Sequence, residues 1–122
     1  MNNRSSIILT GIQDASTAIS LGNGLAWVAE DENDSLRLFD LRTGGAPLKS
    51  YDAKDWYGEG KETDIEASCL GTRNPQRIFW LGSMSNSRKG KERKDRDRLF
   101  ATDMIQKGNA HGLSYVGSAQ IS

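Results

Sequence analysis

Residues 22–29 read Gly-Asn-Gly-Leu-Ala-Trp-Val-Ala, a turn followed by an unbroken apolar run. Asn and Gly tolerate a positive φ, so residues 22–24 predict a tight hairpin turn. The apolar run of residues 25–29 predicts a strand that is covered on both faces. Residues 15–21 precede the turn as another strand, and residues 36–40 and 48–51 form two more after polar breaks. The first half of the chain therefore predicts a four-stranded antiparallel unit.

The second half of the chain repeats this plan with a growing offset. Residues 18–22 match residues 67–71 at an offset of 49, and Trp27 matches Trp80 at an offset of 53. Residues 37–39 recur at an offset of 61, and a fourth strand follows near the end of the chain. Four-stranded units that recur about every 50 residues are typical of β-propeller blades. The alternative is a single eight-stranded sandwich or barrel in which these matches arose by chance.

The predicted fold class is all-β, with about two four-stranded antiparallel blades of a β-propeller. Residues 1–13 form a leading strand segment, residues 14–58 the first blade, and residues 59–122 the second blade with a long basic loop at 83–97. A closed propeller needs about 4–8 blades, so we expect an incomplete fragment whose partners include the remaining blades. A ring of several copies and a two-sheet sandwich are the alternatives. Short helical turns are expected at residues 53–57 and 104–107.

The composition argues against several classes of protein. Sixteen Lys and Arg balance sixteen Asp and Glu, which argues against a uniformly basic nucleic-acid binder. The single cysteine, Cys69, excludes an internal disulfide and a Cys-rich metal site, and we expect it to be a small buried residue of an inner strand. No apolar run is long enough for a membrane span or a signal peptide, which predicts a cytoplasmic protein.

Acidic side chains gather beside the predicted strands at one end of the sheets. Asp64 and Glu66 alternate along a strand, so their carboxylates would share a face about 7 Å apart. Such carboxylates repel each other unless a cation compensates, and a cluster of oxygen ligands fits Ca²⁺. The predicted metal ligands are Asp64, Glu66, Asp14, Glu30 and Asp31. The alternative is ordinary pairing of these carboxylates with Arg or Lys, or capping of turns.

Residues 87–98 form a basic stretch with seven basic and three acidic side chains. Guanidinium and ammonium groups suit phosphate or another polyanion. No aromatic side chain lies between the charges, so single-stranded nucleic acid is not a predicted partner. The predicted anion-binding residues are Arg88, Lys89, Lys91 and Arg93. The alternative is a solvated loop of mixed charge.

Other chemically distinctive residues are predicted to be structural. His111, the only histidine, lies in a predicted turn at the end opposite to the carboxylates, so no Ser-His-acid triad is predicted. Trp27 and Trp80 are predicted to occupy equivalent core positions, as are Arg37 and Arg98 on their strands. The pair at residues 56–57 is predicted to cover a sheet edge.

Six segments, in this order, resemble an uncharacterised bacterial family of β-propeller domains. They are residues 26–33 (AWVAEDEN), 36–39 (LRLF), 64–67 (DIEA), 79–83 (FWLGS), 89–91 (KGK) and 96–102 (RDRLFAT). The family is similar to the esterase-like phytase propellers, and its members are longer than this chain. The resemblance implies a propeller that carries out metal-dependent phosphate ester hydrolysis or binds phosphate. The sequence departs from the family pattern at Ala67 and Met84, where the family has Gly and His.

These observations lead to competing hypotheses about function. As an enzyme, the chain would hold a divalent cation at Asp64 and Glu66 to polarise a phosphoryl oxygen and activate water, while the basic loop holds the anionic substrate. As a non-catalytic propeller, it would present loops to a protein or a polyanion. The third hypothesis is a truncated chain without activity.

Overall fold

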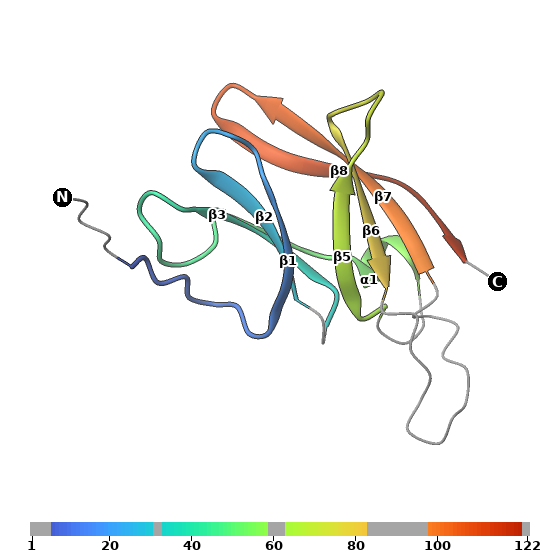
Figure 1. Ribbon diagram of the computed structural model, residues 1–122, viewed down its shortest axis with the longest axis horizontal. Helices are drawn as coiled ribbons and strands as arrows, with labels where there is room; N and C mark the ends of the chain where they lie inside the picture. Colours follow the sequence, from blue (N-terminus) through green and yellow to red (C-terminus); the bar gives the residue numbers. More distant parts are fainter. Residues whose placement is uncertain (1–5, 31–32, 59–62, 83–97, 121–122) are drawn as a thin grey trace, which may run out of the picture.

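The computed structural model describes residues 6–30, 33–58, 63–82 and 98–120. The strands form two four-stranded antiparallel sheets with the orders β1-β2-β3-β4 and β5-β6-β7-β8, which lie against each other (Figure 1). The elements are β1 Ala15–Ser20, β2 Leu25–Glu30, β3 Ser35–Asp40, β4 Lys49–Asp52, α1 Lys54–Tyr57, β5 Ile65–Leu70, β6 Arg77–Gly82, β7 Arg98–Lys107 and β8 Ala110–Gln120. The expected β-rich fold with two four-stranded antiparallel units is confirmed.

One of the two short helical turns expected from the sequence is present in the structure and the other is not. The helical turn expected at residues 53–57 is confirmed as α1. The helical turn expected at residues 104–107 is wrong, because these residues belong to β7 and pair with residues 110–113 in a long hairpin. In the described part of the leading segment, Leu9 makes an isolated parallel bridge to Gly45. No described helix has the length and apolar character that a membrane span requires.

Strand β2 is buried along its whole length, as its apolar run predicts. On one face, Ala26 and Val28 pack with Phe39, and Leu9 and Ile12 of the leading segment cover them. The other face points into the core between the two sheets. The buried members of that core are Leu25, Trp27, Ala29, Leu36, Leu38, Ala53, Ile65, Ile78, Trp80, Phe100 and Leu113. The leading segment therefore shields one side of the first sheet, and the second sheet shields the other.

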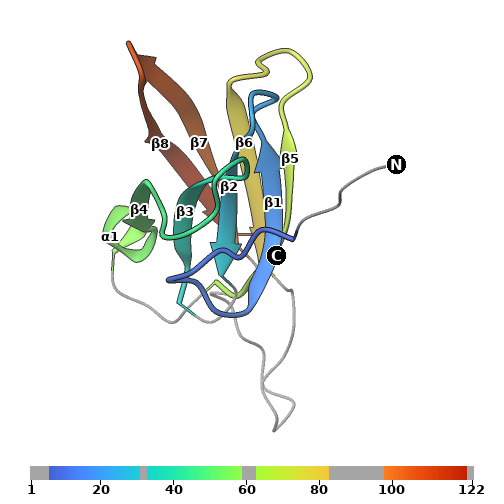
Figure 2. The same ribbon diagram turned by 90° about the vertical axis from the view of Figure 1, so that its left-hand side faces the viewer.

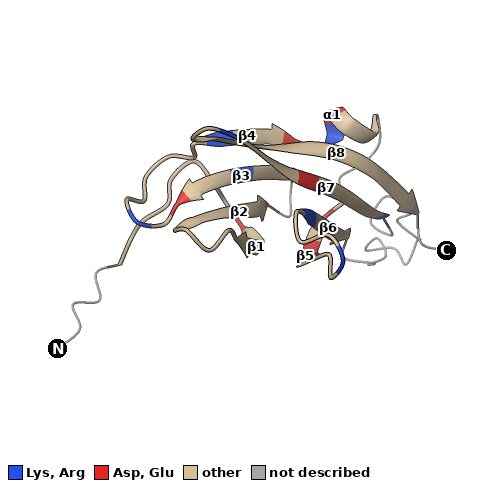
Figure 3. Cartoon of the chain, turned by 90° about the horizontal axis from the view of Figure 1, so that it is seen from above, with Lys and Arg blue, Asp and Glu red and all other residues tan. Residues whose placement is uncertain are grey.

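Contacts at both edges hold the sheets together. Strand β1 lies beside β5, where the Thr17 and Ser68 hydroxyl groups hydrogen bond at 2.7 Å. Figure 2 and Figure 3 show β1 beside β5 and, at the other edge, α1 close to β4 and β8. There the Trp56 ring lies 5.3 Å from that of Tyr51 and 5.6 Å from that of Tyr115, centroid to centroid. This aromatic contact places Trp56 at the edge strands β4 and β8, as predicted for the first residue of the pair 56–57.

Two local features recur 50 residues apart and show which residues of the two sheets correspond. Asp14 and Asp64, each immediately before the first strand of its sheet, both have a positive φ. A bulge then shifts the pairing register at Ser16 in β1 and at Glu66 in β5. A bulge adds one unpaired residue at a defined place, so it is a reliable anchor for aligning the sheets.

On this alignment the two tryptophans do not correspond. In each sheet, a residue pair just before the bulge joins the first strand to the end of the second strand. When positions are counted back along β2 and β6 from these pairs, Trp27 corresponds to Phe79, and Val28 corresponds to Trp80. Successive residues of a strand point to opposite faces of the sheet. When the two sheets are aligned, Trp27 therefore lies on one face of its sheet and Trp80 on the other face of its own sheet. Both are nevertheless fully buried in the core between the sheets. The sheets therefore stack front to back, with the Trp27 face of the first against the Trp80 face of the second.

This one-residue shift corrects two sequence-based expectations. The predicted core location of Trp27 and Trp80 is confirmed, but their predicted equivalence is wrong. Arg37 and Arg98 are not equivalent either, because Arg37 pairs with Val28 whereas Phe100 pairs with Trp80. Their contacts also differ, as described below.

The expectation of a buried Cys69 is also wrong, because its side chain is exposed. Cys69 pairs with Phe79 on the face of the second sheet that points away from the core between the sheets.

Candidate functional site

The predicted carboxylates that the structure describes lie at the end of the sheets where β1 and β5 begin, here called the strand-start end. Asp14 and Asp64 directly precede these strands, with φ values of 49° and 61°. Glu30 is the last residue of β2 and pairs with Ala15. Asp is among the few residue types that tolerate a left-handed conformation, so the backbone alone favours Asp at both positions.

The local backbone differs from the regular strand assumed for Asp64 and Glu66. Asp64 lies before β5 in a left-handed conformation, and Glu66 is the extra residue of the bulge. Two-residue alternation applies only along a regular strand, so it does not fix these carboxylates on a shared face. Within the described ranges, no group of three or more His, Cys, Asp or Glu side chains is arranged to hold a metal ion.

Glu30 is engaged by a basic side chain. Its side chain is almost fully buried, and the Arg37 Nε atom donates a 2.9 Å hydrogen bond to its carboxylate. Arg37 also donates to the Ser50 hydroxyl at 3.0 Å. Glu30 therefore follows the ion-pairing alternative. The remaining predicted ligand, Asp31, and the predicted anion-binding residues Arg88, Lys89, Lys91 and Arg93 lie outside the described residues.

Sequence reasoning missed a buried polar cluster around Asp34, which is fully buried. Its carboxylate accepts hydrogen bonds from the Thr63 backbone N–H, with contacts of 2.8 and 3.0 Å, and from the Asp64 N–H at 3.2 Å. The Tyr57 hydroxyl donates to the same carboxylate. Asp34 thus ties the β2–β3 turn to the segment that leads into the second sheet. The sequence signal was an Asp directly before a strand, like Asp14 and Asp64.

Arg98 completes this cluster from the second sheet. Its guanidinium carbon lies 3.9 Å from the centre of the Tyr57 ring, and its Nη1 atom donates to the Thr63 hydroxyl at 3.1 Å. Burial raises the pKa of the Tyr57 hydroxyl, and its hydrogen bond to Asp34 raises this pKa further. Tyr57 therefore stays protonated and acts as a hydrogen-bond donor. Because the cluster's groups are engaged with one another, it is structural.

A groove lies at the opposite end of the sheets, where the hairpin turns of both sheets meet. This turn-end groove has a volume of about 590 Å³. A smaller hollow of about 260 Å³ adjoins it and shares Asn23, Gln106 and His111. The side chains that line the larger hollow belong to Asn23, Leu25, Leu38, Asp40, Arg42, Leu48, Lys49, Gln106, Asn109, Ala110 and His111. The groove thus receives basic and amide groups from both sheets.

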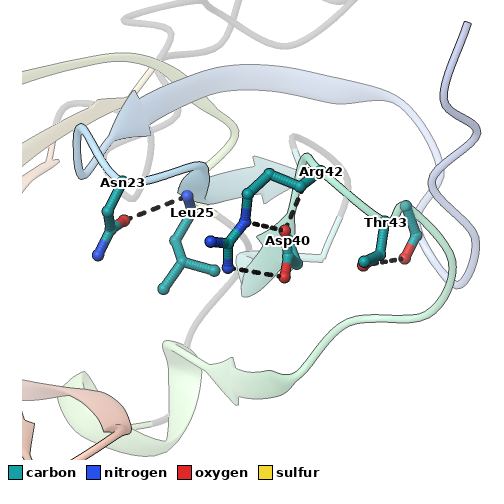
Figure 4. Close-up of polar contacts among 6 residues, drawn as sticks. Asn23, Leu25, Asp40, Arg42 and Thr43 are labelled. Atoms are coloured by element: carbon teal, nitrogen blue, oxygen red, sulfur yellow. Dashed lines mark hydrogen bonds and ion pairs between the residues drawn. The ribbon is translucent and has the colours of Figure 1, made fainter. Parts of the chain in front are cut away.

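Local turn structure fixes the first-sheet wall of the turn-end groove (Figure 4). The Arg42 guanidinium donates to both oxygens of Asp40, at 3.0 and 3.1 Å. These hydrogen bonds lower the pKa of Asp40 and raise that of Arg42. Gly24 has a φ of 87°, and a Cβ atom there would come within 2.7 Å of the Arg42 side chain. Gly24 is therefore needed for Arg42 to cross the turn.

The second-sheet wall is tied to the first sheet beneath the groove. The Tyr51 hydroxyl of β4 accepts a hydrogen bond from the Leu113 N–H of β8 at 3.1 Å. The Lys49 ammonium lies 5.5 Å from the centre of the Tyr51 ring. His111 is half buried in β8, where it pairs with Gln106, so it lies in the strand rather than in the predicted turn. These contacts bring Lys49 and His111 to opposite walls of one groove.

Comparison of the chain with protein-family models, curated proteins and solved structures found no match.

Proposed function

We propose that this chain is a non-catalytic β-propeller module of about two blades, which binds a small polyanion in the turn-end groove. The observation that carries this proposal is the groove itself, where Arg42 and Lys49 of the first sheet face His111 of the second. Its volume of about 590 Å³ is in the range of small-molecule sites. The family resemblance in the sequence implies metal-dependent phosphate ester hydrolysis or phosphate binding, so it supports an anionic ligand but not this particular groove.

Front-to-back stacking of the sheets supports the blade interpretation. In an array of repeats, each unit presents one face to the unit before it and the other face to the unit after it. The Trp27 face of the first sheet meets the Trp80 face of the second, which is the relation that successive repeats require. A sandwich of two like faces would place corresponding residues opposite each other instead.

The lining groups of the groove match a polyanion better than a neutral ligand. Asp40 is the one carboxylate among the lining residues, and its charge is balanced by Arg42. The first-sheet wall therefore has a net positive charge, which Lys49 provides. Asn23 accepts the Leu25 N–H through its side-chain oxygen, which leaves its amide N–H groups as donors for a ligand. Cationic donors on the first-sheet wall, together with amide and imidazole groups on the second-sheet wall, suit several oxygens of one anionic molecule.

Calorimetric titration with inorganic tripolyphosphate tests the groove. We expect the wild-type chain to bind it, and Lys49→Ala to weaken binding about tenfold, as for the loss of one charge-assisted hydrogen bond. His111→Ala removes a hydrogen-bonding side chain from the opposite wall and should weaken binding by a smaller factor. Lys54→Ala is the matched control, because it removes the same charge from α1, outside the groove lining. Affinity should fall with added salt. Absent wild-type binding, or equal weakening by all three substitutions, would contradict the proposal.

Metal-dependent phosphate ester hydrolysis is the alternative function, and it needs the predicted ligands at the strand-start end to share a cation. The Glu30 carboxylate already binds Arg37 there, so a cation would have to compete with a guanidinium. We therefore expect calcium to leave the thermal unfolding midpoint unchanged. A calcium-dependent rise that disappears in both Asp64→Ala and Glu66→Ala, together with phosphatase activity, would establish the hydrolase instead.

A further inference from the structure

The second sheet has an apolar outer face that the described residues leave open. Phe79, Leu99 and Ala101 line it together with Val116, which is 46% exposed. These residues surround a shallow hollow of about 280 Å³. The first sheet also has a face that points away from the core between the sheets, but Leu9 and Ile12 cover it. The two outward-facing sides of the pair of sheets therefore differ.

On the bulge alignment, the open face of the second sheet corresponds to the Trp27 face of the first sheet, which is packed against the second sheet. On the bulge alignment, Phe79 corresponds to Trp27, and the pairing carries Leu99 onto Leu36. Trp27 and Leu36 are fully buried against the second sheet. The open face therefore has the character of the first sheet's inner face, without the sheet that would cover it.

The residues of the covering face are known from the same interface. The second sheet covers the first with Ile78 and Trp80, which correspond to Ala26 and Val28 of the first sheet. Among the described elements, the first sheet is thus the one whose outer face has the character needed to cover the open face. Both rims carry a neutralised ion pair, Arg77–Asp103 at the open face and Arg37–Glu30 at the covering face, so charge does not oppose the contact.

We propose that the outer face of the second sheet binds the first sheet of a second copy of this chain, front to back, as the two sheets pack within one copy. The leading segment, residues 6–13, must leave the covering face for this contact to form. It is held by few backbone hydrogen bonds, from Thr10 N–H to Gly45 and from Gly45 N–H to Ile8. The contact is heterologous, so copies add head to tail and close into a ring if the rotation permits.

Light scattering during size-exclusion chromatography tests this assembly across a range of protein concentrations. We expect a mean mass above that of one chain that increases with concentration, and a single-chain mass for Val116→Lys, which places a charge on the open face. Leu41→Lys is the matched control, because Leu41 is similarly exposed but lies in the β3–β4 turn. This control should associate like the wild type.

Deletion of residues 1–13 provides the second test, because it uncovers Ala26, Val28 and Phe39. We expect the shortened chain to associate at lower concentration than the full chain, and Val116→Lys to reverse this gain. Circular dichroism confirms that each variant remains folded. The proposal is overturned if the full chain stays monomeric at high concentration. It is equally overturned if Val116→Lys and Leu41→Lys change the mass alike.

Discussion

Asp34→Ala is expected to lower the free energy of unfolding by about 4 kcal/mol, the largest loss we expect from any single polar substitution. The substitution leaves the Thr63 and Asp64 backbone N–H groups and the Tyr57 hydroxyl without their acceptor. Each buried donor without a partner costs about 1–3 kcal/mol. The φ of residue 34 is 54°, a left-handed conformation that Asp tolerates and in which Ala costs about 1 kcal/mol more. Urea unfolding measures the loss.

Two further variants separate the causes of this loss. Asp14→Ala changes an exposed aspartate with a similarly positive φ, so it reports the backbone cost alone, about 1 kcal/mol. Asp34→Asn keeps one acceptor oxygen and a side chain that tolerates the left-handed region, so it should fall between the two. If Asp34→Ala costs no more than Asp14→Ala, the carboxylate does not join the sheets.

The positions of the strands could be predicted from the sequence because their signals are local. A Gly-Asn-Gly turn and the apolar run of residues 25–29 mark a hairpin and a doubly covered strand without reference to the rest of the chain. The repeat of this pattern in the second half gave the two four-stranded units for the same reason. Whether these units belong to a closed propeller depends on contacts beyond those described, so that part stays a prediction.

The residue-by-residue alignment of the two sheets could not be predicted from local sequence signals. Aligning Trp27 with Trp80 matches residue types, but a bulge depends on backbone geometry and moves the alignment by one position. In a strand one position exchanges the two faces. The same error affected the expected equivalence of Arg37 and Arg98. The expected burial of Cys69 assumed that both faces of its strand are covered, whereas its side chain is exposed on the outer face.

The candidate site was also only partly accessible from the sequence. The antiparallel order correctly predicted that Asp14, Glu30 and Asp64 lie at one end of the sheets and His111 at the other. The partner of each carboxylate depends on tertiary contacts, such as that between Glu30 and Arg37. The turn-end groove is formed by turns that are far apart in the sequence, so no single sequence motif predicted it.

Trp80→Ala is expected to cost about 4 kcal/mol, as for other large-to-small substitutions of aromatic core residues. Its side chain is fully buried between the sheets and lies 6.3 Å from the Phe100 ring, centroid to centroid. Chemical denaturation measures the loss. Because Trp80→Ala could unfold the chain outright, the milder substitution Trp80→Phe keeps the prediction measurable.

The two tryptophans should respond differently to phenylalanine, although both are fully buried. The Trp80 Nε1–H donates to the buried Thr102 hydroxyl at 3.0 Å, whereas Trp27 Nε1 has no hydrogen-bond partner among the described residues. Trp80→Phe therefore loses a hydrogen bond as well as volume, and should cost about 2 kcal/mol, against about 1 kcal/mol for Trp27→Phe. Equal losses would contradict a net stabilising contribution of the hydrogen bond between Trp80 and Thr102.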